Sequence, residues 1–384
     1  MIKKIPFLLL LSLLPAAALY AQGKGQMTSE FLFPAEPVHN HSSSIVELKD
    51  GRLMVTWYRG SGERTADDVT VEASFLAKNA INWTPRITIA DTPGFPDTNP
   101  VLWVDPQQRL WLFWGLVIAN EWHTSLLKYE RADKGELPFN WGDSIILKPV
   151  NIAEKTKAVF GKIDSERARG IIAKAEDKYF SRMGWFTRTH PITLPGGRYL
   201  VPLYSDGYSF GLMALSDDEG KTWFASEPIV GFGGIQPAVV VRKSGELVAY
   251  LRDNGPPPKR VQIAYSKDNG MSWTNAEDTE IPNSGTSVDV IALKDGRWLM
   301  VNNDTEKGRN SVAVSLSDDE GRTWKWTRHL EREPTGEFHY PSVMQTRDGW
   351  VHVSYSHFSG ERNKQQSIKH ARFNTEWVME GDPK

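Results

Sequence analysis

The chain has 384 residues, of which 40% are hydrophobic and 24% charged, which is the composition of an ordinary globular protein. The formal net charge of −2 gives no basic field for a nucleic acid, so an acidic ligand would have to meet a local arginine cluster. The absence of cysteine excludes disulfides and thiolate metal ligands. Fifteen Trp and eleven Tyr favour a β-rich fold with aromatic turn anchors.

The first residues have the pattern of a secretory signal peptide. Lys3 and Lys4 precede an apolar run at 6–14 and a small-residue stretch at 15–21, with cleavage expected after Ala21. The apolar run is too short for a stable membrane span. We therefore expect a mature chain of residues 22–384 that forms one domain and is exported as a monomer to the periplasm or the exterior.

After a polar lead at 22–37, an apolar strand, a tight turn and a second strand rich in aromatic and β-branched residues recur six times. Asp-Gly and Gly-Gly turns between such runs predict β-hairpins. The six hairpins are Ser43–Gly60, Asn99–Leu116, His190–Ser205, Gln236–Asp253, Thr286–Asp304 and Tyr340–His357.

An eight-residue box follows three of the hairpins. It has the pattern Ser-x-Asp-x-Gly-x-Ser/Thr-Trp, and its copies, which begin 50 and 51 residues apart, are Ser216–Trp223, Ser266–Trp273 and Ser317–Trp324. The Asp can accept hydrogen bonds from the backbone of its own turn, and the Gly allows a positive φ. Asn82-Trp83 and Asn140-Trp141 resemble decayed copies. We interpret the boxes as structural turns.

Six units of about 50 residues, each with three or four strands, predict an all-β fold, a six-bladed β-propeller. The segment at 366–373 is expected to supply the strand that closes the ring. Residues 152–182 lack strand alternation and are rich in Ala, Glu and Lys, with a possible helix cap at 164–167. They predict a helical insertion between blades 2 and 3, either a lid or a surface addition.

Polar residues stand at equivalent places in the six hairpins. In a propeller the innermost strands line the axis, so we expect a small polar pocket there. The first strands begin at His41, Asn99, His190, Gln236, Asp289 and Tyr340, and two of the second strands end at Arg59 and Arg252.

The boxes are identified as the Asp-boxes of sialidases, and the chain resembles the sialidase-like neuraminidase-repeat proteins over nearly all of its mature length. In that family three arginines bind the substrate's carboxylate, a Tyr–Glu pair supplies the nucleophile and an Asp is the acid/base. A neutral Tyr suits this role because the carboxylate on the anomeric carbon would repel an anionic nucleophile. The resemblance implies an exo-acting glycoside hydrolase that removes a terminal acidic sugar from a glycan, without a cofactor or a required metal.

Residue by residue, the resemblance assigns substrate binding to Arg252 and Arg309, the nucleophile to Tyr340 and the acid/base to Asp68, with Asp67 as an alternative. Two positions depart from the family pattern. The first-blade arginine is missing where the sequence reads His39-Asn40-His41-Ser42, and Gln236 replaces the glutamate that activates the tyrosine. Asp289 is the alternative base, and the identity of the acidic sugar stays open.

Two other functions remain open at this stage. One is a lyase, or a hydrolase, that acts on uronic-acid polysaccharides, in which Arg252 neutralises the carboxylate and His41, His190 or Tyr340 moves the proton. The other is a non-catalytic carbohydrate-binding propeller that stacks sugars on tryptophans, namely Trp57, Trp103, Trp114 and Trp185.

Overall fold

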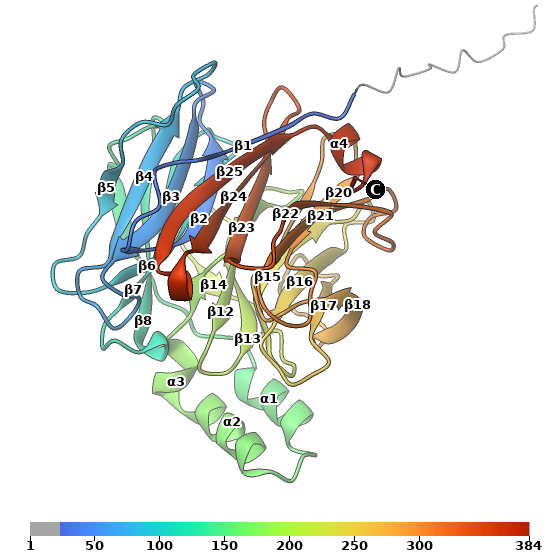
Figure 1. Cartoon of the computed structure of the whole chain (residues 1–384). Helices are drawn as coiled ribbons and strands as arrows, with labels where there is room; N and C mark the ends of the chain where they lie inside the picture. The colour runs from blue at the N-terminus through green and yellow to red at the C-terminus, as the bar shows by residue number, and fades with distance from the viewer. Residues whose placement is uncertain (1–23, 384) are drawn as a thin grey trace, which may run out of the picture.

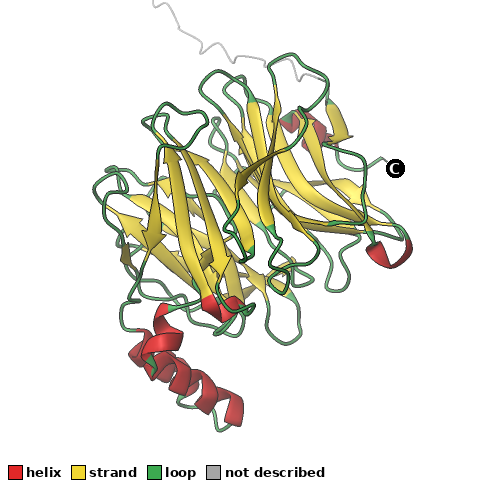
Figure 2. Cartoon of the chain, turned by 90° about the vertical axis from the view of Figure 1, so that its left-hand side faces the viewer, coloured by secondary structure: helices red, strands yellow, loops and turns green. Residues whose placement is uncertain are grey.

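Six antiparallel sheets, the blades of a β-propeller, make up the computed structural model, which describes residues 24–383 (Figures 1 and 2). The predicted signal peptide at 1–21 lies outside the described residues. Blade 1 consists of β2 (His39–Glu47), β3 (Leu53–Gly60), β4 (Thr70–Leu76) and β5 (Ile87–Ala90). Blade 2 consists of β6 (Asp97–Val104), β7 (Leu110–Val117), β8 (Ser125–Ala132) and β9 (Trp141–Ile145). The predicted fold class is confirmed.

The remaining blades follow in chain order. Blade 3 consists of β10 (Phe186–Thr187), β11 (Ile192–Thr193), β12 (Tyr199–Ser205), β13 (Phe210–Ser216) and β14 (Phe224–Ala225). Blade 4 consists of β15 (Gly234–Val241), β16 (Leu247–Asp253), β17 (Arg260–Ser266) and β18 (Glu277–Pro282). Blade 5 consists of β19 (Asp289–Ala292), β20 (Trp298–Asn302), β21 (Ser311–Ser317) and β22 (Trp326–Arg332). Blade 6 consists of β23 (Glu337–Gln345), β24 (Val351–Ser359), β25 (Gln365–Phe373) and β1 (Met27–Phe31), and α4 (Thr375–Glu380) follows it.

The ring is closed by the N-terminal strand. The segment at 366–373 does form a strand, β25, but β1 pairs antiparallel with it and becomes the outer strand of blade 6. The Glu30 carboxylate fixes this pairing, because it lies 2.7 Å from His370 Nδ1 and accepts a hydrogen bond from Trp83 Nε1 at 3.2 Å. The strand predicted at 366–373 is confirmed, whereas the strand β1 within the polar lead at 22–37 was not predicted.

The Asp-boxes are turns that pack on the neighbouring blade. In the first box, the Asp218 carboxylate accepts hydrogen bonds from the backbone N–H groups of Lys221 and Thr222 at 3.1 and 2.9 Å, as predicted. Gly220 has a φ of +81°, and a Cβ there would lie 2.4 Å from the ring of Trp111 in blade 2. Only glycine combines this backbone conformation with this close contact.

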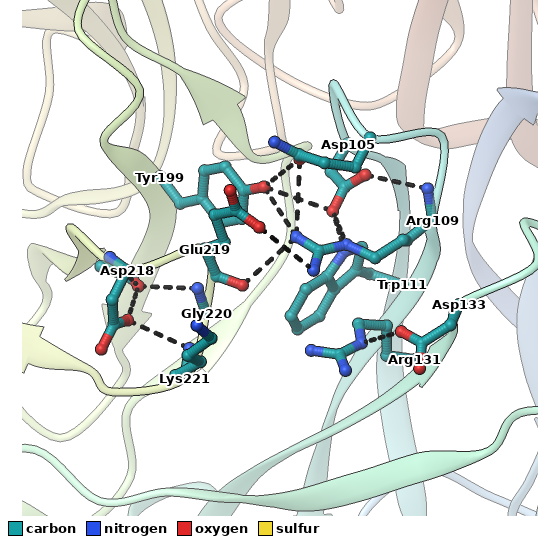
Figure 3. A network of polar contacts seen from close by, with 12 residues as sticks. Asp105, Arg109, Trp111, Arg131, Asp133, Tyr199, Asp218, Glu219, Gly220 and Lys221 are labelled. Atoms are coloured by element: carbon teal, nitrogen blue, oxygen red, sulfur yellow. Dashed lines mark hydrogen bonds and ion pairs between the residues drawn. The ribbon is translucent and has the colours of Figure 1, made fainter.

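A polar network joins the same box to blade 2 (Figure 3). Arg109 binds Asp105 within its own turn at 2.5 Å and reaches the Tyr199 hydroxyl of blade 3 at 2.9 Å. Its guanidinium group also lies 3.6 Å from the Glu219 carboxylate in the box. Because Asp105 is fully buried, the ion pair loses little strength to solvent. The box therefore fastens blade 3 to blade 2.

Three helices form the predicted insertion between blades 2 and 3. They are α1 (Ile152–Phe160), α2 (Glu166–Glu176) and α3 (Lys178–Arg182), and Figure 1 shows them projecting beside β12 and β13. The Ser165 hydroxyl caps α2 by accepting the Ala168 N–H at 3.1 Å. Their apolar side chains share one core cluster with blades 2 and 3. None of the helices within residues 24–383 is long and apolar enough to cross a membrane.

Candidate functional site

Four blades present a polar residue to the axis through the same backbone device. The inner strands β2, β6, β15 and β23 each contain a register shift near their start. At each shift one non-glycine residue has a left-handed backbone, with φ between +49° and +59°: Ser42, Asn99, Gln236 and Tyr340. A β-bulge re-aims its side chain, and non-glycine residues with such angles concentrate at functional sites. Three of these four residues were predicted to lie at the site from the repeat alone.

The centre of the site is the hydroxyl group of Tyr340. It accepts a hydrogen bond from Arg252 Nη1 at 2.7 Å and one from Gln236 Nε2 at 3.3 Å. The ring of His41 lies against the Tyr340 ring with centroids 4.4 Å apart and an interplanar angle of 36°. Tyr340 is partly exposed, whereas the nearby tyrosines Tyr58 and Tyr204 are buried. Tyr340 is therefore the tyrosine that a ligand in the pocket can reach.

Arg309 approaches the same pocket from blade 5. Its Nη1 contacts Nδ1 of His339, and its Nη2 donates to the Gly285 carbonyl at 3.1 Å. His339 Nε2 lies 3.0 Å from the Glu337 carboxylate, so its Nδ1 is the acceptor for the arginine. Burial and the charge of Arg309 lower the pKa of His339 well below its usual value, which keeps the ring neutral. Arg252 and Arg309 are thus both held in place beside Tyr340, as the sequence predicted.

Glu63 provides a carboxylate at this end of blade 1. It lies in the loop between β3 and β4, where its Oε1 accepts the Tyr58 hydroxyl at 3.1 Å and lies 3.3 Å from His39 Nε2. Burial by itself raises the pKa of Glu63, but the hydrogen bond from His39 and the neighbouring charges lower it to about 2. The carboxylate is therefore ionised near neutral pH. The sequence analysis missed this residue.

A second carboxyl group, Asp206, has the opposite electrostatic behaviour. It follows β12 and is half-buried close to Arg252, Arg64 and Glu63. Burial raises its pKa, the two arginines lower it, and the charge of Glu63 adds to the increase, so that the net pKa lies above the usual value. The environments of Glu63 and Asp206 thus shift their pKa values in opposite directions. Such a pair can supply one base and one acid.

Asp68 shares the loop with Glu63, and its hydrogen bonds are to Ser61 of the same loop. It is exposed, and its carboxylate accepts hydrogen bonds from the Ser61 N–H at 3.0 Å and the Ser61 hydroxyl at 2.9 Å. Hydrogen bonding by Ser61 lowers the pKa of Asp68. Asp67 is also exposed and accepts the amide of Asn120 at 3.0 Å. Neither contact joins these two carboxylates to Tyr340, and their catalytic role stays a prediction.

Arg59 is placed away from the predicted cluster as well. Its Nε donates to Glu36 Oε1 at 2.8 Å, and Arg86 lies 3.6 Å from the same oxygen. Arg59 adjoins Tyr58 in β3, and successive side chains of a strand point to opposite faces. The Tyr58 side chain faces the pocket and that of Arg59 faces Glu36.

Asp289 is held by contacts that join blade 5 to blades 6 and 3. Its Oδ2 accepts the Val343 N–H of blade 6 at 2.9 Å, and its Oδ1 lies 3.1 Å from His190 Nδ1. Burial lowers the pKa of His190, but the Asp289 charge outweighs it and the net pKa is raised. Serines make the corresponding contact elsewhere, since Ser44 and Ser342 each accept an N–H of the next blade. Asp289 and His190 therefore serve the ring, and no contact within the described residues supports Asp289 as the base for Tyr340.

Arg188 lies beneath the pocket, and the sequence analysis did not identify it. Its guanidinium group is 4.9 Å from the centroid of the Tyr340 ring and donates to the carbonyls of Pro341 at 2.9 Å and Ser43 at 3.4 Å. The side chain is 2% exposed, and burial lowers its pKa. Asn99, which was predicted, donates to the buried Tyr204 hydroxyl at 3.4 Å. The position of Arg188, just before the third hairpin begins at His190, was the one sequence signal that could have indicated it.

The tryptophans proposed as sugar platforms are unavailable to a ligand because all four are buried. The indole N–H groups of Trp57 and Trp114 also donate hydrogen bonds to Asn40 and Asp97, at 2.9 and 2.6 Å. Their exposed fractions are 0%, 8%, 2% and 3% for Trp57, Trp103, Trp114 and Trp185. These residues belong to the core. That part of the carbohydrate-binding hypothesis was wrong.

The fold is a six-bladed propeller in which the Tyr340 hydroxyl is hydrogen-bonded by Arg252 and Gln236, with Arg188 against its ring. Comparison with known families agrees with this description, since the family model described as a BNR repeat-like domain matches residues 173–353. This match covers slightly less than half of the chain, and part of the sequence is also similar to sialidases. The resemblance found in the Asp-boxes is confirmed.

The similarity in sequence is partial. A sialidase from Clostridium perfringens is 31% identical over 132 residues, which are 29% of this chain and 33% of the relative. An anhydrosialidase from Macrobdella decora is 24% identical over 189 residues, which are 44% of this chain and 24% of the relative. The match thus spans a third or less of the length of these relatives.

Solved structures extend the similarity of fold to almost the whole chain. A protein of unknown function from Dyadobacter fermentans has a TM-score of 0.68 at 16% identity, covering 90% of this chain and 97% of that one. A leech intramolecular trans-sialidase, solved with 2,7-anhydro-Neu5Ac, has a TM-score of 0.70 at 14% identity, covering 92% and 71%. At such identities the likeness shows the fold.

Proposed function

We propose that this protein is an exo-acting glycoside hydrolase that removes a terminal acidic sugar, sialic acid or a similar one, from a glycan. The observation that carries the proposal is the partly exposed Tyr340, whose hydroxyl accepts a hydrogen bond from Arg252 at 2.7 Å. The distant homology to sialidases supports the same reaction class.

Arg252 and Arg309 would bind the carboxylate of the sugar. Both lie near Tyr340, although they belong to other blades. A guanidinium group can bind a carboxylate through two parallel N–H donors. Arg252 uses Nη1 on Tyr340, and its Nη2 makes only a 3.5 Å contact to Asn254. This nitrogen is therefore the better donor for a ligand.

Tyr340 would attack the anomeric carbon while the bond to the leaving oxygen breaks. The N–H donors of Arg252 and Gln236 stabilise the negative charge that develops on its oxygen. The amide of Gln236 cannot take the phenolic proton, and we assign it to Glu63, which is ionised. Glu63 accepts the Tyr58 hydroxyl, and the His41 ring lies against both Tyr58 and Tyr340.

Asp206 would protonate the leaving oxygen, because its raised pKa favours the acid form. In the second half of the reaction, the Asp206 carboxylate takes a proton from the water that attacks the anomeric carbon. The bond to the Tyr340 oxygen breaks, and Glu63 returns the phenolic proton to it. Asp68, the acid/base implied by the resemblance, is the alternative on the loop that carries Glu63.

Product analysis tests the proposal. The purified mature protein is incubated with a panel of sialylated and uronate-containing glycans, and the products are identified by mass spectrometry. A free acidic sugar that carries one added water is the expected product, and Tyr340→Phe should remove it. Absence of any product from the whole panel would refute the proposal.

A lyase is the second candidate, and a specific contact favours it. The His41 ring lies against the Tyr340 ring, and burial lowers the pKa of His41 well below the usual value, so that a neutral imidazole contacts the reactive tyrosine. His41 and Tyr340 could abstract a proton from the carbon next to a uronate carboxylate. The presence of Gln236 in place of a glutamate also favours this second candidate. The same experiment distinguishes the two, since elimination adds no water and creates a new near-ultraviolet absorbance.

We further propose that the protein acts outside the cytoplasm as a mature chain from residue 22. N-terminal sequencing of the protein recovered from the periplasm or medium of its source cell should begin at Gln22. A cytoplasmic protein that retains Met1 would refute this.

A further inference from the structure

The helical insertion and blades 3 and 4 enclose a groove next to the pocket. The groove has a volume of about 90 Å³, and its lining includes Phe160 and Ile163 of the insertion, Tyr208 and Ser209 of blade 3, and Phe232 and Pro256 of blade 4. It is too small to enclose a sugar ring, but it can take one face of a ring. Phe232 is 51% exposed and Ile163 36%, so an apolar surface is open to a ligand.

One side chain links this groove to the pocket. The Asn254 amide donates to Ser209 Oγ at 3.3 Å, and its Oδ1 lies 3.5 Å from Arg252 Nη2. Arg252 in turn binds the Tyr340 hydroxyl. A chain of contacts thus leads from the reactive tyrosine to the groove, and a molecule that extends from the pocket past Asn254 would reach Phe232.

The exposed phenylalanine is held rigidly. Phe160 of α1 contacts its ring edge-on, with centroids 5.3 Å apart and an interplanar angle of 61°. The backbone beside it is close-packed, since a Cβ on Gly255 would lie 1.8 Å from the Phe232 carbonyl oxygen. The Asn254 N–H also donates to the Gly233 carbonyl at 2.8 Å. A rigid aromatic ring that keeps one face free is a stacking surface.

The insertion also supports the loop that carries Asp206. The Tyr208 hydroxyl donates to the Lys174 carbonyl of α2 at 2.7 Å, and Lys174 Nζ donates to the Gly207 carbonyl at 3.3 Å. Helices and pocket loop therefore form one packed unit, and the groove has a fixed position relative to the proposed acid.

We propose that this groove is the subsite for the leaving group of the reaction, and that it binds a neutral sugar residue whose apolar face stacks on Phe232. Asn254 and Ser209 supply polar contacts to its hydroxyl groups. The inference rests on the proposed function, and it gives the insertion a role: it selects oligosaccharides whose terminal acidic sugar is joined to another sugar.

Two measurements test the subsite. The first compares kcat/KM for the acidic sugar linked to a disaccharide with kcat/KM for its methyl glycoside, in the wild type, Phe232→Ala and Phe232→Tyr. Stacking energies correspond to a loss of about three- to tenfold. We expect this loss in Phe232→Ala for the disaccharide-linked substrate alone, and recovery in Phe232→Tyr. Trp141→Ala is the matched control, because Trp141 is a 54% exposed aromatic residue of blade 2.

The second measurement is ligand-observed NMR with lactose, N-acetyllactosamine and cellobiose, which needs no turnover. Binding that weakens in Phe232→Ala but not in Trp141→Ala supports the subsite, even if no glycan is hydrolysed and the proposed function fails. Equal loss for both substrates would mean a structural role, and unchanged binding and kinetics would remove the subsite. A wild-type dimer that Phe232→Ala dissociates would show that the face binds a second copy, and would also overturn the proposal.

Discussion

The choice between Glu63 and Asp68 is the sharpest test of the proposed chemistry. Glu63→Gln and Asp68→Asn remove one charge each from the same loop. A positioned general base contributes about 10²- to 10⁴-fold, so Glu63→Gln should lower kcat by that factor, or about 3 to 5 kcal/mol. Asp68 is exposed and bound to Ser61, so Asp68→Asn should change kcat by less than about threefold and stability by about 0.5 kcal/mol or less.

Folding should survive the substitution at Glu63. Glutamine keeps an oxygen that can accept from Tyr58 and His39, and the Glu63 side chain is 39% exposed, so solvent weakens its charge interactions. We expect a stability loss of about 1 kcal/mol. The assay is release of the acidic sugar at saturating substrate, with thermal unfolding in parallel. A near-normal rate in Glu63→Gln would exclude Glu63 as the base for Tyr340, and an inactive Asp68→Asn would make Asp68 the acid/base in place of Asp206.

Three further predictions follow from the electrostatics and the packing. Asp206→Asn should lower kcat by about 10²-fold or more and remove the fall in rate as pH rises through the raised pKa of Asp206, and an unchanged pH profile would exclude it as the acid. His352 has its pKa lowered to about 3 by burial and by His370, so the folded state resists a proton that the unfolded state binds below about 6.5. The contribution of His352 to the free energy of unfolding should therefore be complete above pH 6.5 and decrease toward pH 3, by on the order of 3 kcal/mol at pH 4. Urea unfolding at a series of pH values measures this loss. His352→Gln should lose less stability over the same range, and a loss equal to that of the wild type would contradict the prediction. Gly220→Ala should lower the free energy of unfolding by about 2 to 4 kcal/mol, because the backbone has a positive φ and a Cβ would lie 2.4 Å from the Trp111 ring. Gly245→Ala has a similar backbone but open space, and should lower it by about 1 kcal/mol. Thermal unfolding measures both losses, and equal losses would contradict the role of the Trp111 contact.

The blades follow from local patterns of residues. Asp-Gly turns and alternating strands act over a few residues, and the repeat places equivalent residues at equivalent positions whatever the rest of the chain does. For this reason the six hairpins, the boxes and the helical insertion could be predicted. The same argument explains why Gln236 and Tyr340 were identified: each stands at the start of an inner strand, where every blade faces the axis.

The contacts between side chains of different blades could not be predicted from local patterns and are seen in the three-dimensional structure alone. Glu63 and Asp68 occupy one irregular loop, and no periodicity tells which of them faces the pocket. Arg188 carries no repeat signal, and its partners are carbonyls of blades 1 and 6. Strand β1 is too short and polar to stand out, and its partner β25 lies at the other end of the chain. These contacts depend on how the ring closes, which is set by packing between distant segments rather than by the local pattern of residues.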